Sequence, residues 1–360
     1  MSSPSLVGGI ALRAYDLPGA ITFAAAYGLL LPLLVYRLVE KKWRSVIMIQ
    51  VFFFAVERPV MFSLRAAVAA KPNTESPGLS EYMQATFALG YLTLAEILLR
   101  LVRSILVNTT NGTSTADTES HYPAVTQPPP LVSISSGFWK PSLPPPSPSV
   151  PNVDDPRRRF WFRRWCEFLL SLYIVAMVLA VVATAHVWKA TDSGWNSINQ
   201  ALRYTSSAIG LVLVLLESCT LLWASKNVPR IDPRAVRFLL VLSTLLTIPP
   251  LYRLIVMHNT TPDHARPDHQ ALNTRADKAA FYVLHLLPEF AVVAIMSLWN
   301  VRDICQMGWK GDERCWDETP KEREKRERKE RERAEKKEAR LELKTRSSNT
   351  SSNDSAATLA

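Results

Sequence analysis

The stretch Ser45–Ala70, SVIMIQVFFFAVERPVMFSLRAAVAA, decides the fold. It is apolar and long enough for a helix that crosses a bilayer, which needs about 20 residues. Yet it carries Glu57 and Arg58 near its middle, then Pro59, and Arg65 two turns later. A charge at bilayer depth costs roughly 2.5–3.5 kcal/mol on insertion scales, so such side chains usually face the inside of a bundle and have partners there. The stretch therefore predicts a membrane helix whose charged side chains contact other helices.

Six further stretches reach a similar length. Together with the second span, the predicted spans are Leu17–Tyr36, Arg44–Ala67, Tyr82–Leu106, Arg164–Trp188, Ala201–Trp223, Ala235–Met257 and Ala279–Trp299. Because lipid offers backbone groups no hydrogen-bond partner, such segments form helices. We therefore expect an all-α fold, a seven-helix transmembrane bundle. A soluble protein with long buried helices is disfavoured, since ordinary helices average about 11–12 residues.

Lys and Arg are enriched in every second connection, between helices 1 and 2, 3 and 4, and 5 and 6. The positive-inside rule then places the N-terminus outside and the C-terminus in the cytosol. The net charge of +10 indicates attraction to anionic lipid at the cytoplasmic face, and we expect no nucleic-acid partner. Asn108 and Asn111 begin N-x-T sequons in a loop that this topology makes cytosolic, so their glycosylation would reverse it. The sequence does not distinguish the plasma membrane from an endomembrane.

Composition divides the chain into five parts. They are 1–107 with helices 1–3, 108–163 as a disordered Pro-rich cytoplasmic loop, 164–300 with helices 4–7, 301–346 as an interfacial and charged helical tail, and 347–360 as a disordered C-terminus. The PxxP spacing of the loop would suit an SH3- or WW-type cytosolic protein, or the loop is a spacer. The tail has i,i+4 pairs of opposite charge but no apolar a/d repeat, so it resembles a coiled coil in charge pattern only. Cys305 and Cys315 are candidates for palmitoylation or plain thiols.

Several ionisable residues are predicted in the outer half of the membrane. They are Glu57, Arg58, Arg65, Arg253, His285 and Glu289. We expect Glu289 to pair with Arg58 or Arg253, and Glu57 with the other arginine, because adjacent residues point about 100° apart on a helix. A water-filled cavity open to the outside would hydrate them. The alternatives are a ligand site and an ion-pair network that only joins helices.

A second polar layer is predicted nearer the cytosol. Glu96 and Arg100 are spaced i,i+4 and suit a pair within one helix, and Glu217 is expected at a similar depth. We interpret this layer as a structural lock, although with the outer cluster it would also suit a transport path. Only His186 and His285 lie at membrane depth, on different helices, and no nucleophile or phosphate-binding motif is present. We therefore expect no enzyme, no cofactor and no metal site.

Four stretches carry a family resemblance. They are VERPVMFSLR, RYTSSAIGLVLVLLES, IPPLYRL and YVLHLLPEF. The chain resembles a set of fungal seven-helix membrane proteins that includes the lipid-translocating exporter-like family and uncharacterised receptor-like proteins. The resemblance implies the seven-helix architecture and a fungal-type origin, and it assigns no individual functional residue. The Asp-Arg-Tyr and Asn-Pro-x-x-Tyr motifs of rhodopsin-like receptors are absent.

Three functions follow from these patterns. The leading prediction is a receptor- or sensor-like protein with an outer-half polar cavity for an amphiphilic ligand. The alternatives are a transporter or exporter of lipid or another amphiphile, and a membrane-anchored scaffold whose loop and tail recruit cytosolic partners.

Overall fold

The structure is a computed structural model. It describes residues 3–71, 76–110, 155–185, 193–228, 230–261 and 272–309, together with six isolated positions in 324–338. The chain forms two units, Met1–Asp312 and Glu313–Ala360. The six described positions of the second unit are helical, and Arg328 lies 3.7 Å from Glu332. The predicted loop core at 111–154, Cys315 and the C-terminal residues 347–360 lie outside the described part.

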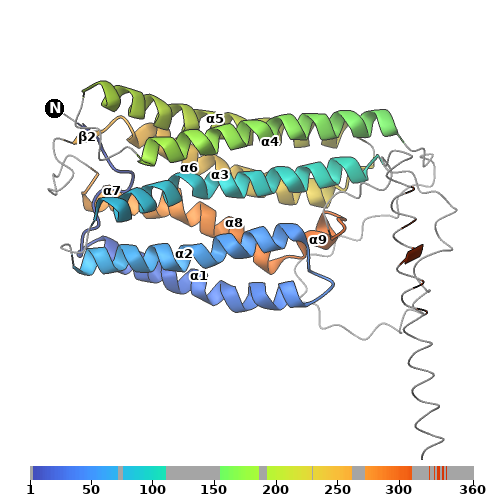
Figure 1. Ribbon diagram of the computed structural model, residues 1–360, viewed down its shortest axis with the longest axis horizontal. Coiled ribbons are helices and arrows are strands. Elements are labelled where there is room, and N and C mark those ends of the chain that lie inside the picture. The colour runs from blue at the N-terminus through green and yellow to red at the C-terminus, as the bar shows by residue number, and fades with distance from the viewer. Residues whose placement is uncertain are drawn as a thin grey trace, which may run out of the picture. The chain divides into compact units, whose positions relative to one another are not determined.

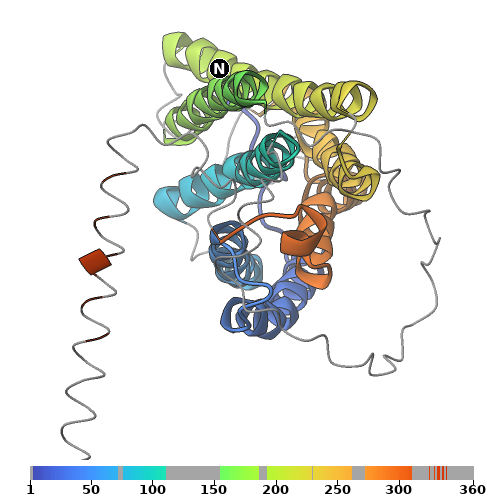
Figure 2. The ribbon, with the colours of Figure 1, turned by 90° about the vertical axis from the view of Figure 1, so that its right-hand side faces the viewer.

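The first unit is a bundle of long helices, which lie side by side in the two views of Figure 1 and Figure 2. They are α1 (Asp16–Val39), α2 (Val46–Ala70), α3 (Pro77–Asn108), α4 (Pro156–Ala185), α5 (Ser193–Asn227) and α6 (Pro233–Val256), followed by a seventh span made of α7 (Arg275–Ala280), η3 (Phe281–Leu286) and α8 (Leu287–Leu298). A two-residue strand β1 (Ser3–Pro4) pairs antiparallel with β2 (Thr260–Thr261). All seven spans are long and apolar enough to cross a membrane. The predicted all-α, seven-helix fold is confirmed, and the chain is a multi-pass membrane protein.

Helix boundaries follow local capping chemistry. Ser45 and Ser76 accept hydrogen bonds from backbone N–H groups in the first turns of α2 and α3, and Asp232 does so for α6. Thr274 and Asp277 form a reciprocal capping box at the start of α7. These side chains satisfy N–H groups that have no partner within the helix.

We call the end of the bundle near Asp16 the N-terminal end, and the other the opposite end.

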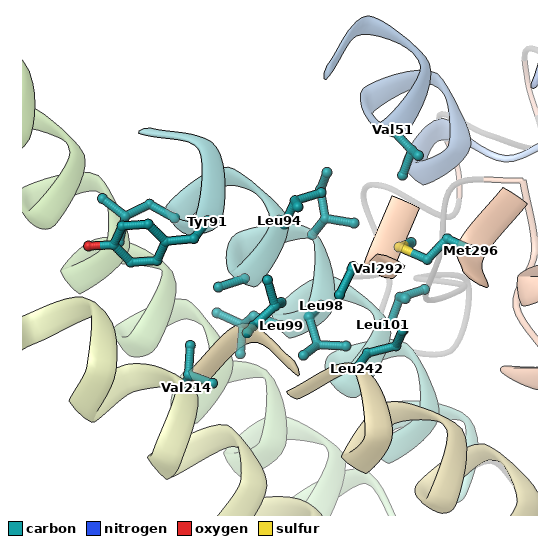
Figure 3. Packing of buried hydrophobic residues seen from close by; sticks show 14 of the residues in the cluster. Val51, Tyr91, Leu94, Leu98, Leu99, Leu101, Val214, Leu242, Val292 and Met296 are labelled. Carbon is teal, nitrogen blue, oxygen red and sulfur yellow. The ribbon is translucent and has the colours of Figure 1, made fainter. Parts of the chain in front are cut away.

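Helix α3 is the centre of the bundle. Of the 18 most apolar consecutive residues of α3, 72% are buried, compared with 17% for the corresponding residues of α1. In Figure 3, Tyr91, Leu94 and Leu98 of α3 lie among apolar side chains of the surrounding helices, including Val214 of α5 and Val292 of α8. Lipid is as apolar as these side chains, so van der Waals packing holds such contacts together. Polar residues on α3 are therefore placed to contact several helices.

The seventh span changes its winding halfway. Residues Phe281–Leu286 form a π-helix, and the N–H of Leu287 donates to the carbonyl of Tyr282, five residues back. Pro288 follows in the first turn of α8 and has no N–H to donate. Single π turns are frequent at functional sites. The winding turns His285 and Glu289 inward, where both are fully buried.

Residues 301–309 close the opposite end of the bundle. The helix α9 (Val301–Ile304) places Arg302, whose guanidinium donates to the carbonyl of Lys41 at 2.7 Å. Cys305 is 1% exposed, and burial raises the pKa of its thiol to about 12. Acylation of this predicted lipidation candidate would therefore require the segment to open.

Candidate functional site

Arg58 and Glu289 form an ion pair at the middle of the bundle. Arg58 Nη2 lies 2.9 Å from Glu289 Oε2, and each side chain is 1% exposed. The guanidinium also lies over the ring of Phe54, 4.4 Å from its centroid. Of the two partners predicted for Glu289, Arg58 and Arg253, the structure shows Arg58, and the pair joins α2 to α8.

The predicted pairing of Glu57 with Arg253 is wrong. Glu57 accepts a hydrogen bond from the Tyr82 hydroxyl at 3.0 Å and lies 3.7 Å from Arg58 Nε. Its side chain remains 32% exposed, because it points to the outside of the bundle between α2 and α3. The two adjacent side chains do approach each other, since the long arginine reaches back towards its neighbour.

Gly90 of α3 makes room for the Arg58–Glu289 pair. A Cβ atom at this position would overlap Arg58 Nη2 and lie 2.7 and 2.8 Å from the two Glu289 oxygens. Because glycine has no side chain, Gly90 lets the pair contact the central helix directly.

Arg253 and His285 lie near this pair without sharing an ion pair. Arg253 Nε is 3.4 Å from the Ser207 hydroxyl, and its Nη1 has no hydrogen-bond partner among the described residues. The His285 ring stacks on Tyr252 with centroids 5.9 Å apart, and its Nε2 lies 3.2 Å from the carbonyl of Phe87.

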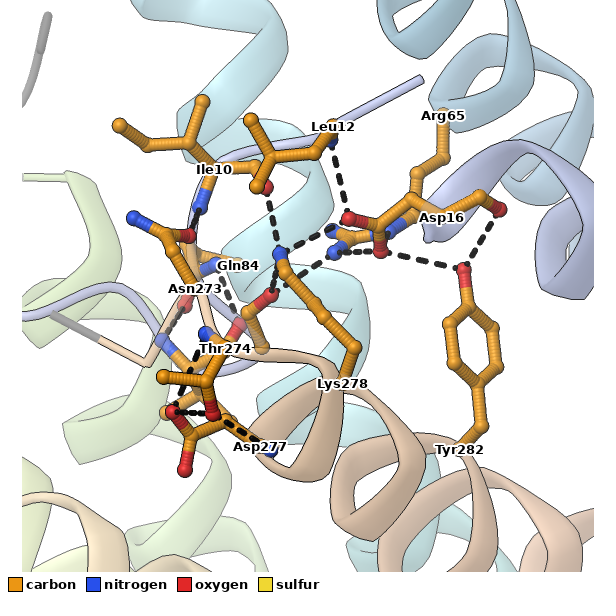
Figure 4. Close-up of polar contacts among 12 residues, drawn as sticks. Ile10, Leu12, Asp16, Arg65, Gln84, Asn273, Thr274, Asp277, Lys278 and Tyr282 are labelled. Carbon is orange, nitrogen blue, oxygen red and sulfur yellow. Dashed lines mark hydrogen bonds and ion pairs between the residues drawn. The ribbon is translucent and has the colours of Figure 1, made fainter. Parts of the chain in front are cut away.

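The sixth predicted residue, Arg65, belongs to a separate cluster at the N-terminal end (Figure 4). Its guanidinium donates to Asp16 Oδ1 at 2.6 Å, and Lys278 Nζ lies 2.8 Å from Asp16 Oδ2. Tyr282 adds a hydrogen bond to the same carboxylate at 3.2 Å. One carboxylate thus serves two cations from α2 and α7, and all three charged side chains are buried.

The N-terminal segment, residues 5–12, fills the space where we expect a cavity open to the outside. Its backbone supplies the acceptors: Gly8 O receives hydrogen bonds from Arg65 at 2.9 Å and from Lys278 at 2.6 Å. The Gln84 amide both accepts from and donates to the backbone of Val7, at 3.1 and 3.0 Å. Val7 is fully buried. The buried charges are thus covered by backbone rather than by open water at this point.

A cleft of about 490 Å³ lies between α2 and α3. Apolar side chains such as Phe53 and Leu89 line most of it, and Glu57, Arg58 and Tyr82 supply polar groups. Phe53 is 66% exposed and Tyr82 is 40% exposed, so the cleft opens on the side of the bundle. It extends along α3 as far as Glu96. Its size and its few convergent polar groups are typical of small-molecule sites.

The second polar layer divides into two parts. Arg100 Nε donates to Glu96 Oε1 at 2.6 Å, as the spacing predicts. Glu217 is fully buried on α5 and faces the Tyr173 hydroxyl, with no ion-pair partner in the ranges that the structure covers. Neighbouring Ser218 bonds to Ser243, which ties α5 to α6.

No family model, curated protein or solved structure matches the chain. The resemblance to fungal seven-helix families therefore stays a prediction. Within the described ranges, no group of three or more His, Cys, Asp or Glu side chains is placed to hold a metal ion.

Sequence reasoning missed the residues that bury Arg65. Asp16 falls one residue before the predicted first span, and Lys278 one residue before the predicted seventh. A usable signal was present, since Arg65 near the same end needs a carboxylate and Asp16 is the acidic residue next to helix 1. Nothing in the sequence indicates that residues 5–12 fold into the bundle.

Proposed function

We propose that this protein binds a membrane amphiphile in the α2/α3 cleft and acts as a sensor of it. The observation that supports this most directly is an apolar cleft on the side of the bundle with a carboxylate and a phenol at its rim. Amphiphiles in the bilayer would reach it laterally. Their chains would lie against Phe53 and Leu89, while the head group meets Glu57 and Tyr82.

The exposed polar groups define the head group. Glu57 is ionisable, 32% exposed, and accepts from Tyr82, so it is placed to accept a hydrogen bond from a ligand. Arg58 lies behind it and is occupied by Glu289. We infer a head group that donates hydrogen bonds, a hydroxyl or an ammonium, rather than an anionic one.

The Arg58–Glu289 pair supplies a route for the signal. A ligand that pulls on Glu57 also acts on the neighbouring Arg58, and through it on Glu289 in α8. That carboxylate follows the π segment and Pro288, where the backbone hydrogen bonding is already interrupted. The seventh span is thus the element we expect to shift.

The test is photo-crosslinking in vesicles with a long-chain amine that carries a diazirine and an alkyne. Labelled peptides should come from α2 and α3, and Leu89→Trp, which fills the cleft, should reduce labelling several-fold. Leu29→Trp is the matched control, because Leu29 is 80% exposed on α1, away from the cleft. Labelling spread evenly over all helices, or equal in the two Trp variants, would contradict the proposal.

Transport is the second candidate, because the cleft carries polar groups on both sides of the middle of α2. Beyond Glu57 it continues past Thr93 to Gln50 and Glu96. Reconstitution with a fluorescent long-chain amine and a membrane-impermeant quencher separates the two functions. A transporter moves the probe between leaflets, whereas a sensor binds it without exchange.

The opposite end offers a place for anionic lipid. A cavity of about 610 Å³ is lined by Lys41, Lys42 and Arg302, with Asp303 as the acidic member. We propose that this end faces the cytosol, where anionic head groups are enriched. Scaffolding by the loop and tail remains a prediction, because those segments lie mostly outside the described residues.

A further inference from the structure

Two buried arginines near the N-terminal end have no carboxylate beside them. Arg203 of α5 is 5% exposed and donates from Nη2 to the carbonyl of Ser5 at 2.9 Å. Arg253 of α6 is 3% exposed, and the one hydrogen bond of its guanidinium to a described residue goes to Ser207. No Asp or Glu of the described ranges lies within 4 Å of either guanidinium. Isolated charges at membrane depth are costly, so a partner is expected.

The groups around these arginines are rich in hydrogen-bond donors. Arg253 Nε is 3.4 Å from the hydroxyl of Ser207, four residues after Arg203 on α5, so the two arginines reach the same part of the bundle. Asn199 lies one turn before Arg203, is 2% exposed, and has no partner for either amide atom. Ser207 lies one turn after Arg203, and the Tyr91 hydroxyl approaches it from α3. Unpartnered, buried donors on neighbouring helices are what an anion requires.

The charge balance of this half of the bundle points the same way. Five cations are fully or almost fully buried there: Arg58, Arg65, Arg203, Arg253 and Lys278. Two carboxylates are buried with them, Asp16 and Glu289. Asp16 is occupied by Arg65 and Lys278, and Glu289 by Arg58. Among the described residues, Arg203 and Arg253 therefore form no ion pair, and Glu289, which is bonded to Arg58, gives Arg253 only a longer-range attraction.

We propose that Arg203 and Arg253, with Asn199 and Ser207, bind a phosphate-type oxyanion. Guanidinium groups suit such oxyanions because their planar N–H forks donate in parallel to two oxygens. The anion is either free inorganic phosphate or the phosphate head group of a lipid. The site is independent of the α2/α3 cleft, whose exposed group is a carboxylate.

The experiment uses the full-length protein, purified in phosphate-free detergent buffer. The midpoint of thermal unfolding is measured while inorganic phosphate or a short-chain phosphatidic acid is added. We expect a saturable rise with at least one of them. Phosphate alone would identify a free oxyanion, and the lipid alone a head group. No rise with either would overturn the proposal.

Variants assign the effect to the site. Arg203→Gln and Arg253→Gln should weaken binding at least tenfold, because each removes charged hydrogen bonds. Without anion, both should be at least as stable as the wild type, since an uncompensated charge is gone. Arg237→Gln is the control, the same change at an exposed position of α6.

Arg253→Lys keeps the positive charge but loses the planar pair of guanidinium N–H donors, so this variant should bind the anion with intermediate affinity. If a Gln variant fails to fold, this variant and the wild-type titration decide. If the arginine variants bind the anion as tightly as the wild type does, the assignment is refuted.

Discussion

Replacing Gly90 by alanine tests the central ion pair without touching either charged residue. The added Cβ would overlap Arg58 Nη2 and lie within 2.8 Å of both Glu289 oxygens. Real Cβ atoms do not approach polar atoms so closely, so the pair has to separate or move off α3. Both partners are 1% exposed, and neither can turn to water without leaving the bundle.

The expected loss follows from this geometry. Breaking a buried ion pair costs about 3–5 kcal/mol, because it leaves charges without compensation. Alanine itself returns about 0.5–1 kcal/mol in a helix, since glycine has the larger conformational freedom to lose. The free energy of unfolding should therefore fall by about 2–4 kcal/mol where the two charges separate, and by less where the two flexible side-chain ends move off α3 together.

The measurement is unfolding in detergent, with Gly28→Ala as the matched control. Gly28 is also helical, but a Cβ there meets nothing within 4 Å, so that variant should be equal or more stable. In an Arg58→Met/Glu289→Leu background the penalty of Gly90→Ala should change, because the two sites are coupled. If Gly90→Ala is as harmless as Gly28→Ala, the pair does not contact α3 and our reasoning fails.

Three further predictions concern other parts of the bundle. Asp16→Asn should lower the free energy of unfolding by about 3–5 kcal/mol, because Arg65 and Lys278 lose their shared carboxylate, and the loss should shrink in an Arg65→Met background. Gln84→Ala should expose the N-terminal segment, since two hydrogen bonds to Val7 disappear, and faster protease cleavage before Asp16 would show it. Cys305 should be alkylated at least roughly a hundredfold more slowly in the folded protein than after unfolding in SDS. Between pH 7 and 9 its folded-state rate should stay low, because the raised pKa of about 12 keeps the thiol protonated where an ordinary thiol ionises. Mass spectrometry follows the alkylation of Cys305, and equal rates in the folded and the unfolded protein would refute this prediction.

The positions of single charges show where sequence reasoning reached its limit. The partner of Glu289 could be limited to Arg58 or Arg253 in advance, because helix counting gives depth and a buried charge needs a partner at that depth, and the structure selects Arg58. The partner of Glu57 could not be predicted, because counting residues from the helix ends gives depth in the membrane but not which neighbouring helix a side chain faces. Asp16 and Lys278 were missed because both lie at helix starts, where boundaries uncertain by one residue decide whether a charge is in the membrane.

The sequence by itself determined the seven spans, their all-helical nature and the presence of charges inside them. These depend on length and composition, which are local properties of the chain. Only the tertiary structure decided that Gly90 admits the Arg58–Glu289 pair, that residues 5–12 cover the Arg65 cluster, and that Arg253 contacts Ser207, one turn from Arg203. Such contacts depend on the rotation of each helix and on which helices become neighbours, and both are set by packing between residues far apart in the chain.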